Sequence, residues 1–94
     1  MKVIVRLIAK PDAVQEVKSI LAGLVGPTRR EGGCIAYEWF QNNADACEFT
    51  SVEEWRDQAA LDAHWVTPHV KDALARGVPL LAAPPDDRRY ARIA

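Results

Sequence analysis

The chain is short of cysteine and histidine and contains no long apolar run, and each shortage excludes a class of protein. It has two cysteines and two histidines among 94 residues. Two cysteines are too few for a disulfide scaffold, and Cys34 and Cys47 lack the spacing of a zinc site. No stretch approaches the ~18 consecutive apolar residues of a membrane span, because Arg6 and Lys10 interrupt the apolar N-terminal run. We therefore expect a cytoplasmic protein with no membrane partner and no bound metal.

The chain also lacks an excess of either charge and a glycine-rich phosphate loop. Lys and Arg number 12 and Asp and Glu 13, which gives a net charge of −1. Nucleic-acid-binding domains usually carry a strongly basic surface, so no nucleic-acid partner is expected. No nucleotide-binding motif is present either, so no flavin or NAD cofactor is expected. The hydrophobic content of 49% is enough for one core, and we expect a single domain over residues 1–94.

The apolar periodicity predicts four strands and three helices. Strands are expected where apolar side chains alternate, and helices where they recur every three or four residues. The predicted order is a strand at 2–9, a helix from Pro11 that Gly26-Pro27 breaks or kinks, strands at 34–41 and 47–55, helices at 58–65 and 67–77, and a strand at 87–93. This order is typical of the α+β ferredoxin-like (split βαβ) fold, with a four-stranded antiparallel sheet.

Residues 42–45 have the composition of a turn, which predicts that the two middle strands form a hairpin. If Gln41 pairs with Ala46, Cys34 lies opposite Glu53 and Cys47 opposite Phe40, and the cysteines are too far apart to form a disulfide. Alternation then places large apolar groups on both faces of the sheet: Val3, Val5, Leu7, Phe49 and Trp55 on one, and Ile4, Ile8, Ile35, Tyr37, Trp39 and Val52 on the other. Helices cover only one face in this fold, so we expect a homodimer through the other face.

Several short motifs resemble those of the antibiotic biosynthesis monooxygenase (ABM) domain family, to which small quinol monooxygenases belong. The resemblance spans essentially the whole chain and rests on Glu31–Glu38 (EGGCIAYE), Phe49, Glu53, Trp55, Ala59–Leu61, His64, Thr67–His69 and Tyr90. It implies a homodimer of ferredoxin-like subunits, a dimeric α/β barrel, with a pocket between the sheet and the helices of each subunit. It also implies oxidation by O₂ without metal, flavin or haem.

His64 and Glu53 are the candidate catalytic residues. The resemblance matches His64 to a family histidine, and a histidine can accept a phenolic proton near neutral pH. Alternation points Glu53 to the face that carries Phe49 and Trp55, where a hydrogen bond to His64 would satisfy its carboxylate. The alternatives are a His64 bonded to a backbone carbonyl and a Glu53 with a structural capping or ion-pair role.

Four further side chains are candidates for substrate binding: Tyr37, Phe49, Trp65 and His69. Trp65 follows His64 directly, whereas Trp39 and Trp55 are expected in the core or an interface. His69 is either at the pocket mouth or a solvated residue beside the expected Thr67 cap. Cys34 is expected to be a core cysteine rather than a nucleophile.

The favoured function is a cofactor-independent monooxygenase that oxidises an electron-rich aromatic compound, such as a quinol, an anthrone or a polyketide-like phenol, with O₂. Two alternatives stay open: an isomerase or cyclase that uses the same pocket without O₂, and a non-catalytic dimeric module that binds a small ligand. Haem degradation is not expected. Haem-degrading relatives use an asparagine in the first strand, which is absent here, and a histidine further along the last helix, where this chain continues as Lys71-Asp72-Ala73-Leu74.

Overall fold

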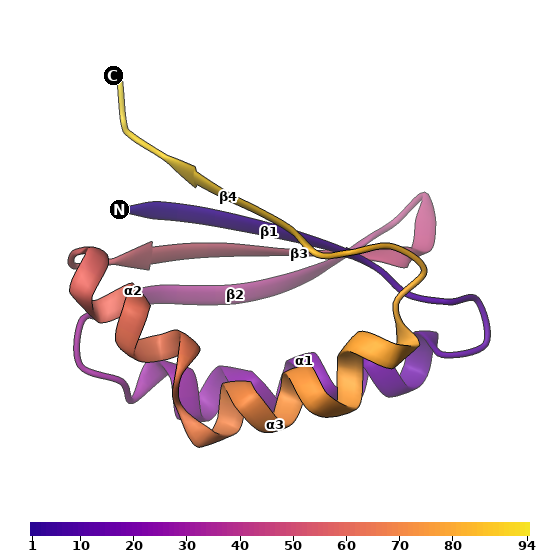
Figure 1. The fold of residues 1–94 in the computed structure, drawn as a ribbon. Coiled ribbons are helices and arrows are strands. Elements are labelled where there is room, and N and C mark those ends of the chain that lie inside the picture. Colours follow the sequence, from indigo (N-terminus) through magenta and orange to yellow (C-terminus); the bar gives the residue numbers. More distant parts are fainter.

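A four-stranded antiparallel sheet carries three helices on one of its faces (Figure 1). The computed structural model describes residues 1–94. Its elements are β1 (Lys2–Ile8), α1 (Val14–Arg29), β2 (Cys34–Asn42), β3 (Asp45–Trp55), α2 (Gln58–Trp65), α3 (Pro68–Gly77), a 3₁₀ turn (Val78–Leu80) and β4 (Asp86–Tyr90). None of the helices has the length and hydropathy needed to cross a lipid bilayer.

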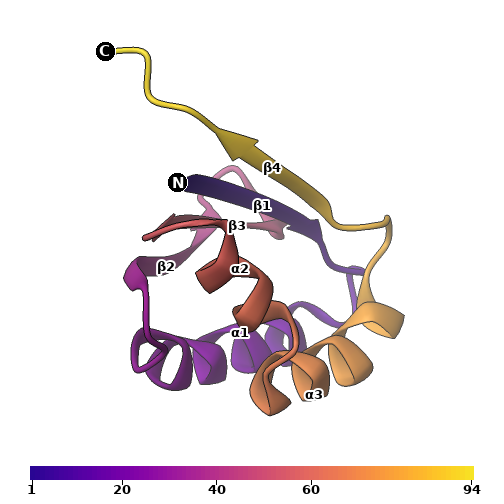
Figure 2. The ribbon, with the colours of Figure 1, turned by 60° about the vertical axis from the view of Figure 1, so that its left-hand side comes forward.

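The strands lie in the order β2-β3-β1-β4, and every neighbouring pair is antiparallel. This order confirms the predicted ferredoxin-like fold. The helices lie together below the sheet, while its other face is uncovered and the chain end after β4 leads away from the body (Figure 2). The core lies between these two layers and contains apolar side chains from β1, β2 and β3 and from all three helices: Val3, Val5, Val17, Ile20, Leu21, Leu24, Tyr37, Phe49, Trp55, Leu61 and Val70.

Two predicted boundaries of α1 are wrong. The helix begins at Val14 rather than at Pro11, because the preceding residues form a turn in which the Ala13 N–H donates to the Lys10 carbonyl at 2.9 Å. It continues through Pro27 to Arg29. Proline removes one backbone donor, but Pro27 lies in the last turn and the next residue, Thr28, is fully buried, so packing of this turn offsets the cost. β4 ends at Tyr90, three residues before the predicted end.

The hairpin register differs from the predicted one by three residues. Asn42 pairs with Asp45 at the turn, but the next pair is Gln41 with Phe49, so residues 46–48 form an irregularity on β3 alone. Tyr37 therefore lies opposite Glu53 and Phe40 opposite Thr50. A second irregularity between Cys34 and Ala36 places Cys34 opposite Trp55, two residues from its predicted partner. An odd shift exchanges the two faces of a strand.

This exchange corrects the predicted composition of both sheet faces. Tyr37 and Trp39 point toward the helices rather than toward the uncovered face, and Tyr37 is 2% exposed. The uncovered face keeps Ile4, Ile8 and Val52 and gains a half-exposed Phe40, among charged side chains that include Arg6, Glu48 and Arg88. It is thus less apolar than the alternation alone predicts.

The connection from α1 to β2 passes very close to α2 at Gly33. This residue has a φ of +86°, and a Cβ atom placed on it would lie 2.5 Å from the Ala60 Cβ. The Gly33 carbonyl also accepts a hydrogen bond from the Arg56 backbone at 2.8 Å. Only glycine tolerates both this backbone conformation and this approach.

Replacing Gly33 with alanine is expected to lower the free energy of unfolding by about 1–3 kcal/mol, because the new methyl group adds a clash to a strained backbone. Urea unfolding followed by tryptophan fluorescence measures the change. The matched control is Gly32→Ala, since a Cβ at Gly32 meets nothing within 4 Å. Equal stability of the two variants would contradict this account.

Candidate active site

His64 lies at the buried end of α2, between the sheet and the helices. The carboxylate of Asp57 accepts the Ala60 N–H at 2.9 Å and so starts α2. From this start Leu61 and His64 face inward, and His64 is 3% exposed. Its imidazole packs against the indole of Trp55, with 4.6 Å between ring centroids, and against the ring of Tyr37, at 5.7 Å. The inward orientation predicted for His64 is present.

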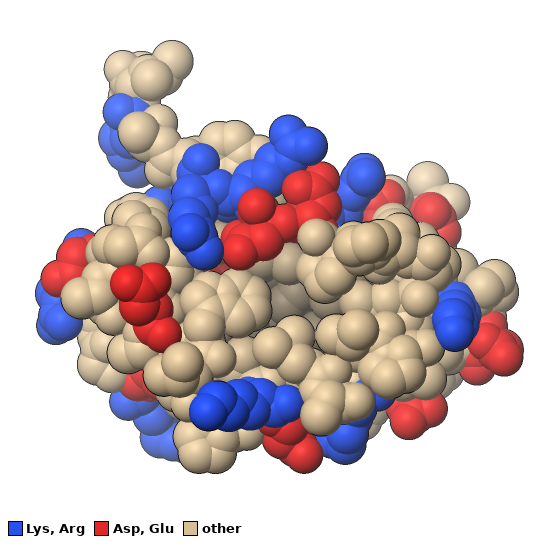
Figure 3. All heavy atoms as spheres, viewed as in Figure 1, with Lys and Arg blue, Asp and Glu red and all other residues tan.

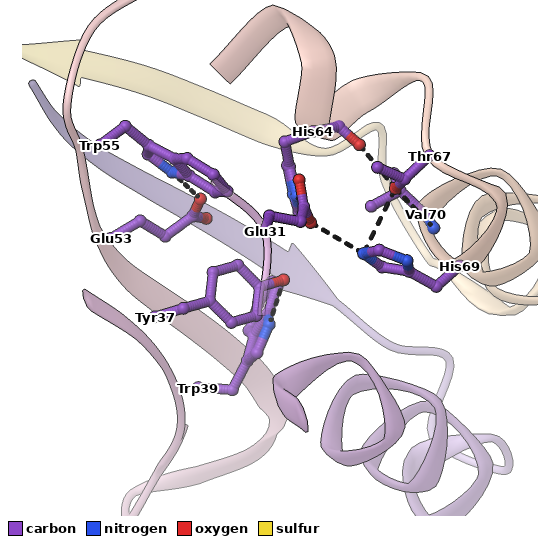
Figure 4. A network of polar contacts seen from close by, with 9 residues as sticks. All are labelled: Glu31, Tyr37, Trp39, Glu53, Trp55, His64, Thr67, His69 and Val70. Atoms are coloured by element: carbon purple, nitrogen blue, oxygen red, sulfur yellow. Dashed lines mark hydrogen bonds and ion pairs between the residues drawn. The ribbon is translucent and has the colours of Figure 1, made fainter. Parts of the chain in front are cut away.

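The partner of His64 is Glu31, from the connection between α1 and β2 (Figure 4). Glu31 Oε2 lies 2.7 Å from His64 Nδ1 and 2.8 Å from His69 Nε2. A carboxylate only accepts hydrogen bonds, so a neutral His64 donates its Nδ1–H to Glu31 and keeps a lone pair on Nε2. Nε2 makes no hydrogen bond within the protein, and His64 lines an apolar cavity. This arrangement is that of a base held in one tautomer by a carboxylate.

Thr67 orients both histidines at the corner between α2 and α3. Its hydroxyl donates to the His64 carbonyl at 2.8 Å, accepts the Val70 N–H at 3.4 Å as the N-cap of α3, and lies 3.3 Å from His69 Nε2. This cap is the predicted one. His69 is thereby held against Glu31, which corrects the expectation of a solvated residue beside the cap.

Glu53 is buried as expected, but the predicted hydrogen bond between Glu53 and His64 is wrong. One Glu53 oxygen accepts the Ser51 hydroxyl and the other accepts the Trp55 indole N–H at 2.9 Å. Ser51, Glu53 and Trp55 alternate along one face of β3, so the carboxylate finds both partners on its own strand. Glu31 occupies the position on His64 that Glu53 was expected to take.

The phenol of Tyr37 is a neutral hydrogen-bonding group beside His64. Its oxygen accepts the Trp39 indole N–H at 2.9 Å. Burial, and to a smaller extent the negative charge of Glu53 and Glu31, raises the pKa of Tyr37 far above its usual range. The phenol therefore stays protonated.

The cavity in front of His64 has a volume of about 240 Å³, and 14 of its 19 lining residues are hydrophobic. Figure 3 shows the molecular surface hollowed between the sheet and the helices, with mostly uncharged walls and charged groups above. Its polar lining groups include Tyr37, Glu53, His64 and Asp87, and no lysine or arginine lines it.

The candidate residues divide into those that line this cavity and those that do not. Tyr37, Glu53, His64 and Trp65 line it. Phe49 does not, because its ring is covered within the core, and His69 does not, because it is turned toward Glu31. Cys34 packs at the edge of the core as a free, partly buried thiol.

Sequence reasoning missed two residues of the site, Glu31 and Trp39. Glu31 enters the sequence prediction only as the first residue of the motif Glu31–Glu38, with no role in the site, although an acidic residue next to a glycine pair was the available signal. Trp39 was expected in the core or an interface, and the shifted register brings it to the cavity wall.

Residues 1–76 match the family described as antibiotic biosynthesis monooxygenase. The chain belongs to this family. The match confirms the resemblance that the motifs indicated, and the structure carries the ferredoxin-like fold of its relatives.

Two similar proteins agree with this assignment. The protein named "Putative monooxygenase Rv0793" of Mycobacterium tuberculosis is 35% identical over 82 residues, which are 87% of this chain and 80% of that protein. Its solved structure has a TM-score of 0.93 to this chain, with 99% and 94% of the two chains covered and 30% identity. A crystal structure described as an antibiotic biosynthesis monooxygenase gives a TM-score of 0.94 at 31% identity, covering 99% of this chain and 98% of that one.

A further relative, "Uncharacterized protein sll1783" of Synechocystis, is considerably longer. It is 33% identical over 81 residues, which cover 86% of this chain but 55% of that protein. The chain thus spans about half the length of this relative.

Replacing Tyr37 with phenylalanine is expected to flatten the loss of stability at alkaline pH. The tyrosines of the unfolded chain ionise near pH ~10, whereas Tyr37 in the folded chain does so only at higher pH. This raised pKa contributes stability that is complete below about pH 10 and is lost as the pH rises toward the native pKa. Urea unfolding between about pH 9 and 11.5 measures it, and the wild type should lose up to about 1.4 kcal/mol more per pH unit than Tyr37→Phe.

The matched control is Tyr90→Phe, which removes the same hydroxyl from an exposed position. If the free energy of unfolding fell as steeply with rising pH in Tyr37→Phe as in Tyr90→Phe, the raised pKa of Tyr37 would be contradicted.

Proposed function

We propose that this protein is a cofactor-independent monooxygenase that oxidises an electron-rich, neutral aromatic compound with O₂. One observation carries the proposal: the Glu31–His64 pair leaves the Nε2 lone pair of His64 free beside a mostly apolar cavity. His64 accepts a proton from the substrate, and Glu31 stabilises the resulting imidazolium and fixes the ring. Membership of the ABM family and the naming of its relatives as monooxygenases support this reaction class.

The substrate supplies the electrons in this scheme. Loss of a proton to His64 leaves a phenolate or carbanion, which transfers an electron to O₂ far more readily than the neutral compound does. For an anthrone, the ring CH₂ group and O₂ give a ring carbonyl and water, so one oxygen atom enters the product and the other leaves as water. The four electrons that this requires all come from the substrate carbon. An apolar cavity also protects the reactive anion from water.

The charge, aromatic content and volume of the cavity limit the substrates that can bind in it. No lysine or arginine lines it, whereas Glu53 and Asp87 do. A phosphate or carboxylate group would therefore meet negative charge without a compensating cation. The aromatic walls of Tyr37, Trp39 and Trp65 favour a planar ring. The volume of about 240 Å³ leaves room for a ring system larger than benzene, which fits an apolar cavity of ~150 Å³.

Replacing His64 with alanine is expected to lower kcat by about 10²–10⁴-fold, the usual contribution of a general base. Glu31→Gln should give a smaller loss, because glutamine can accept the Nδ1–H but carries no charge to stabilise the imidazolium. Oxygen uptake and quinone absorbance measure turnover of hydroquinones and anthrones, on chelator-treated protein and corrected for autoxidation. The matched control is Glu38→Gln, an exposed carboxylate that points away from the site.

The outcomes separate the possible functions. Oxygen-dependent turnover that falls in His64→Ala supports the monooxygenase. Product formation that persists without O₂ would favour an isomerase or cyclase, and saturable ligand binding without turnover would favour a binding module. An unchanged rate in His64→Ala would contradict the assigned base.

We further propose that two copies of the chain pair through the uncovered sheet faces. Phe40 is 51% exposed there, beside the partly buried Ile4, Ile8 and Val52. Charged side chains on this face pair with one another, such as Arg6 with Glu48 and Lys2 with Glu54. A second copy can therefore pack on this face without burying an excess of positive or negative charge.

Replacing Phe40 with aspartate is expected to shift the protein from dimer to monomer, because it puts a charge in the apolar part of this face. Sedimentation velocity over a range of concentrations measures the assembly state, and circular dichroism checks the fold. Val66→Asp is the control, since Val66 is 64% exposed at the end of α2 on the helical side. A monomeric wild type, or a Phe40→Asp dimer of unchanged affinity, would contradict the proposed pairing.

A further inference from the structure

Glu31, His64 and His69 bring three possible metal-ligand atoms together. Glu31 Oε2, His64 Nδ1 and His69 Nε2 all lie within 4.8 Å of one another. They come from the α1–β2 connection, the last turn of α2 and the first turn of α3. We propose that these three residues form a binding site for one divalent transition-metal ion, with Zn²⁺ as the reference ion, and that a bound ion prevents His64 from accepting a proton.

The donor set suits such an ion. Two imidazole nitrogens and one carboxylate oxygen are preferred ligands of zinc, iron and cobalt, whereas calcium and magnesium prefer oxygen alone. Bonds of ~2.0–2.1 Å place neighbouring ligand atoms of a tetrahedral zinc ion roughly 3.3 Å apart. The two contacts of the Glu31 oxygen with the histidine nitrogens, 2.7 and 2.8 Å, are shorter than this value, and the three ligand atoms all lie within 4.8 Å of one another. An ion can therefore replace the two shared hydrogens after side-chain shifts on the order of 0.5–1 Å.

The ligands are also held in place by neighbouring groups. The Glu31 backbone N–H donates to the Thr28 carbonyl at 3.0 Å, and the Glu31 carbonyl accepts the Cys34 N–H at 3.3 Å. Thr67 bonds to the carbonyl of His64 and lies beside His69 Nε2. Groups that orient the ligands in this way contribute much of the affinity of natural metal sites.

The ion and a cavity ligand would meet opposite edges of the same imidazole. Glu31 and His69 do not line the cavity, but their side chains are 12% and 24% exposed. Nδ1 is turned toward Glu31, outside the cavity lining, so an ion bound between Nδ1, Glu31 and His69 does not occupy the cavity that the His64 ring lines. Binding of the ion does not require the cavity to be empty.

The chemical consequence follows from the two tautomers of imidazole, and it rests on the function proposed above. A neutral imidazole that ligates a metal through Nδ1 carries its remaining hydrogen on Nε2. Nε2 is then a donor and cannot accept the proton of a substrate. A bound ion thus inhibits by changing the tautomer of His64, without competing for the cavity.

Metal binding is tested first, without any substrate. Isothermal titration of the chelator-treated full chain with Zn²⁺ should give one ion per chain, and Co²⁺ should give visible ligand-field absorption without a thiolate charge-transfer band. His69→Ala should weaken binding by about 10–100-fold or more, because it removes one ligand. Glu38→Gln and Cys34→Ser, which remove a carboxylate and a thiol outside the site, should bind as the wild type does.

No saturable Zn²⁺ binding, or binding that His69→Ala leaves unchanged, would overturn the proposed site. Loss of binding in Cys34→Ser would also overturn it, since the ion would then depend on the thiol.

Inhibition is tested second, by oxygen uptake with increasing Zn²⁺. The wild type should lose kcat at the Zn²⁺ concentrations that fill the site while KM stays constant, and His69→Ala should need at least tenfold more Zn²⁺ for half-inhibition of its own metal-free rate. An unchanged rate with the site filled, or a rise in KM alone, would overturn the tautomer mechanism. If no substrate is turned over, the function proposed above fails, while the titration still decides whether the metal site exists.

Discussion

The charge of a single carboxylate, enclosed between two imidazoles, is the constraint on which the site depends. Glu31 has a side chain that is 12% exposed, and leaving such a charge without partners would cost several kcal/mol. Its partners must come from elsewhere in the chain, and His64 and His69 provide them from two helices. Two local features bring these three side chains together. The positive φ of Gly33 allows the α1–β2 connection to lie against α2, and the Thr67 hydroxyl bonds to the His64 carbonyl at the corner between α2 and α3.

The buried carboxylate of Glu53 and the partly buried carboxylate of Glu31 are satisfied by different partners. Glu53 is bonded to Ser51 and Trp55 on its own strand, so it fixes the indole beneath the cavity and does not reach His64. The Glu31 carboxylate makes its hydrogen bonds only with His64 and His69, so its charge interacts directly with side chains that can gain or lose a proton. In the proposed reaction the imidazolium of His64 would thus be stabilised from outside the cavity, while the cavity walls are mostly apolar.

The sequence predicted the parts of this structure that depend on local pattern. The order of strands and helices, the Thr67 cap and the inward face of His64 all follow from periodicity and cap residues within a few positions. The failures depend on contacts between distant segments. Pro27 stays helical because Thr28 is buried, and Glu31 meets His64 across 33 positions of the chain. The hairpin register was wrong because turn composition predicts the turn pair but not the three unmatched residues that follow it on β3.

These unmatched residues, 46–48, also determine which side chains form the cavity wall. Since they shift the pairing of β2 by an odd number, they turn Tyr37 and Trp39 inward and Glu38 and Phe40 outward. A deletion or insertion of one residue at this point would rotate the strand by half a turn and place a carboxylate and a phenylalanine on the wall instead. The length of this short irregularity thus controls several wall residues of the cavity together, because one change of chain length would replace all of them at once.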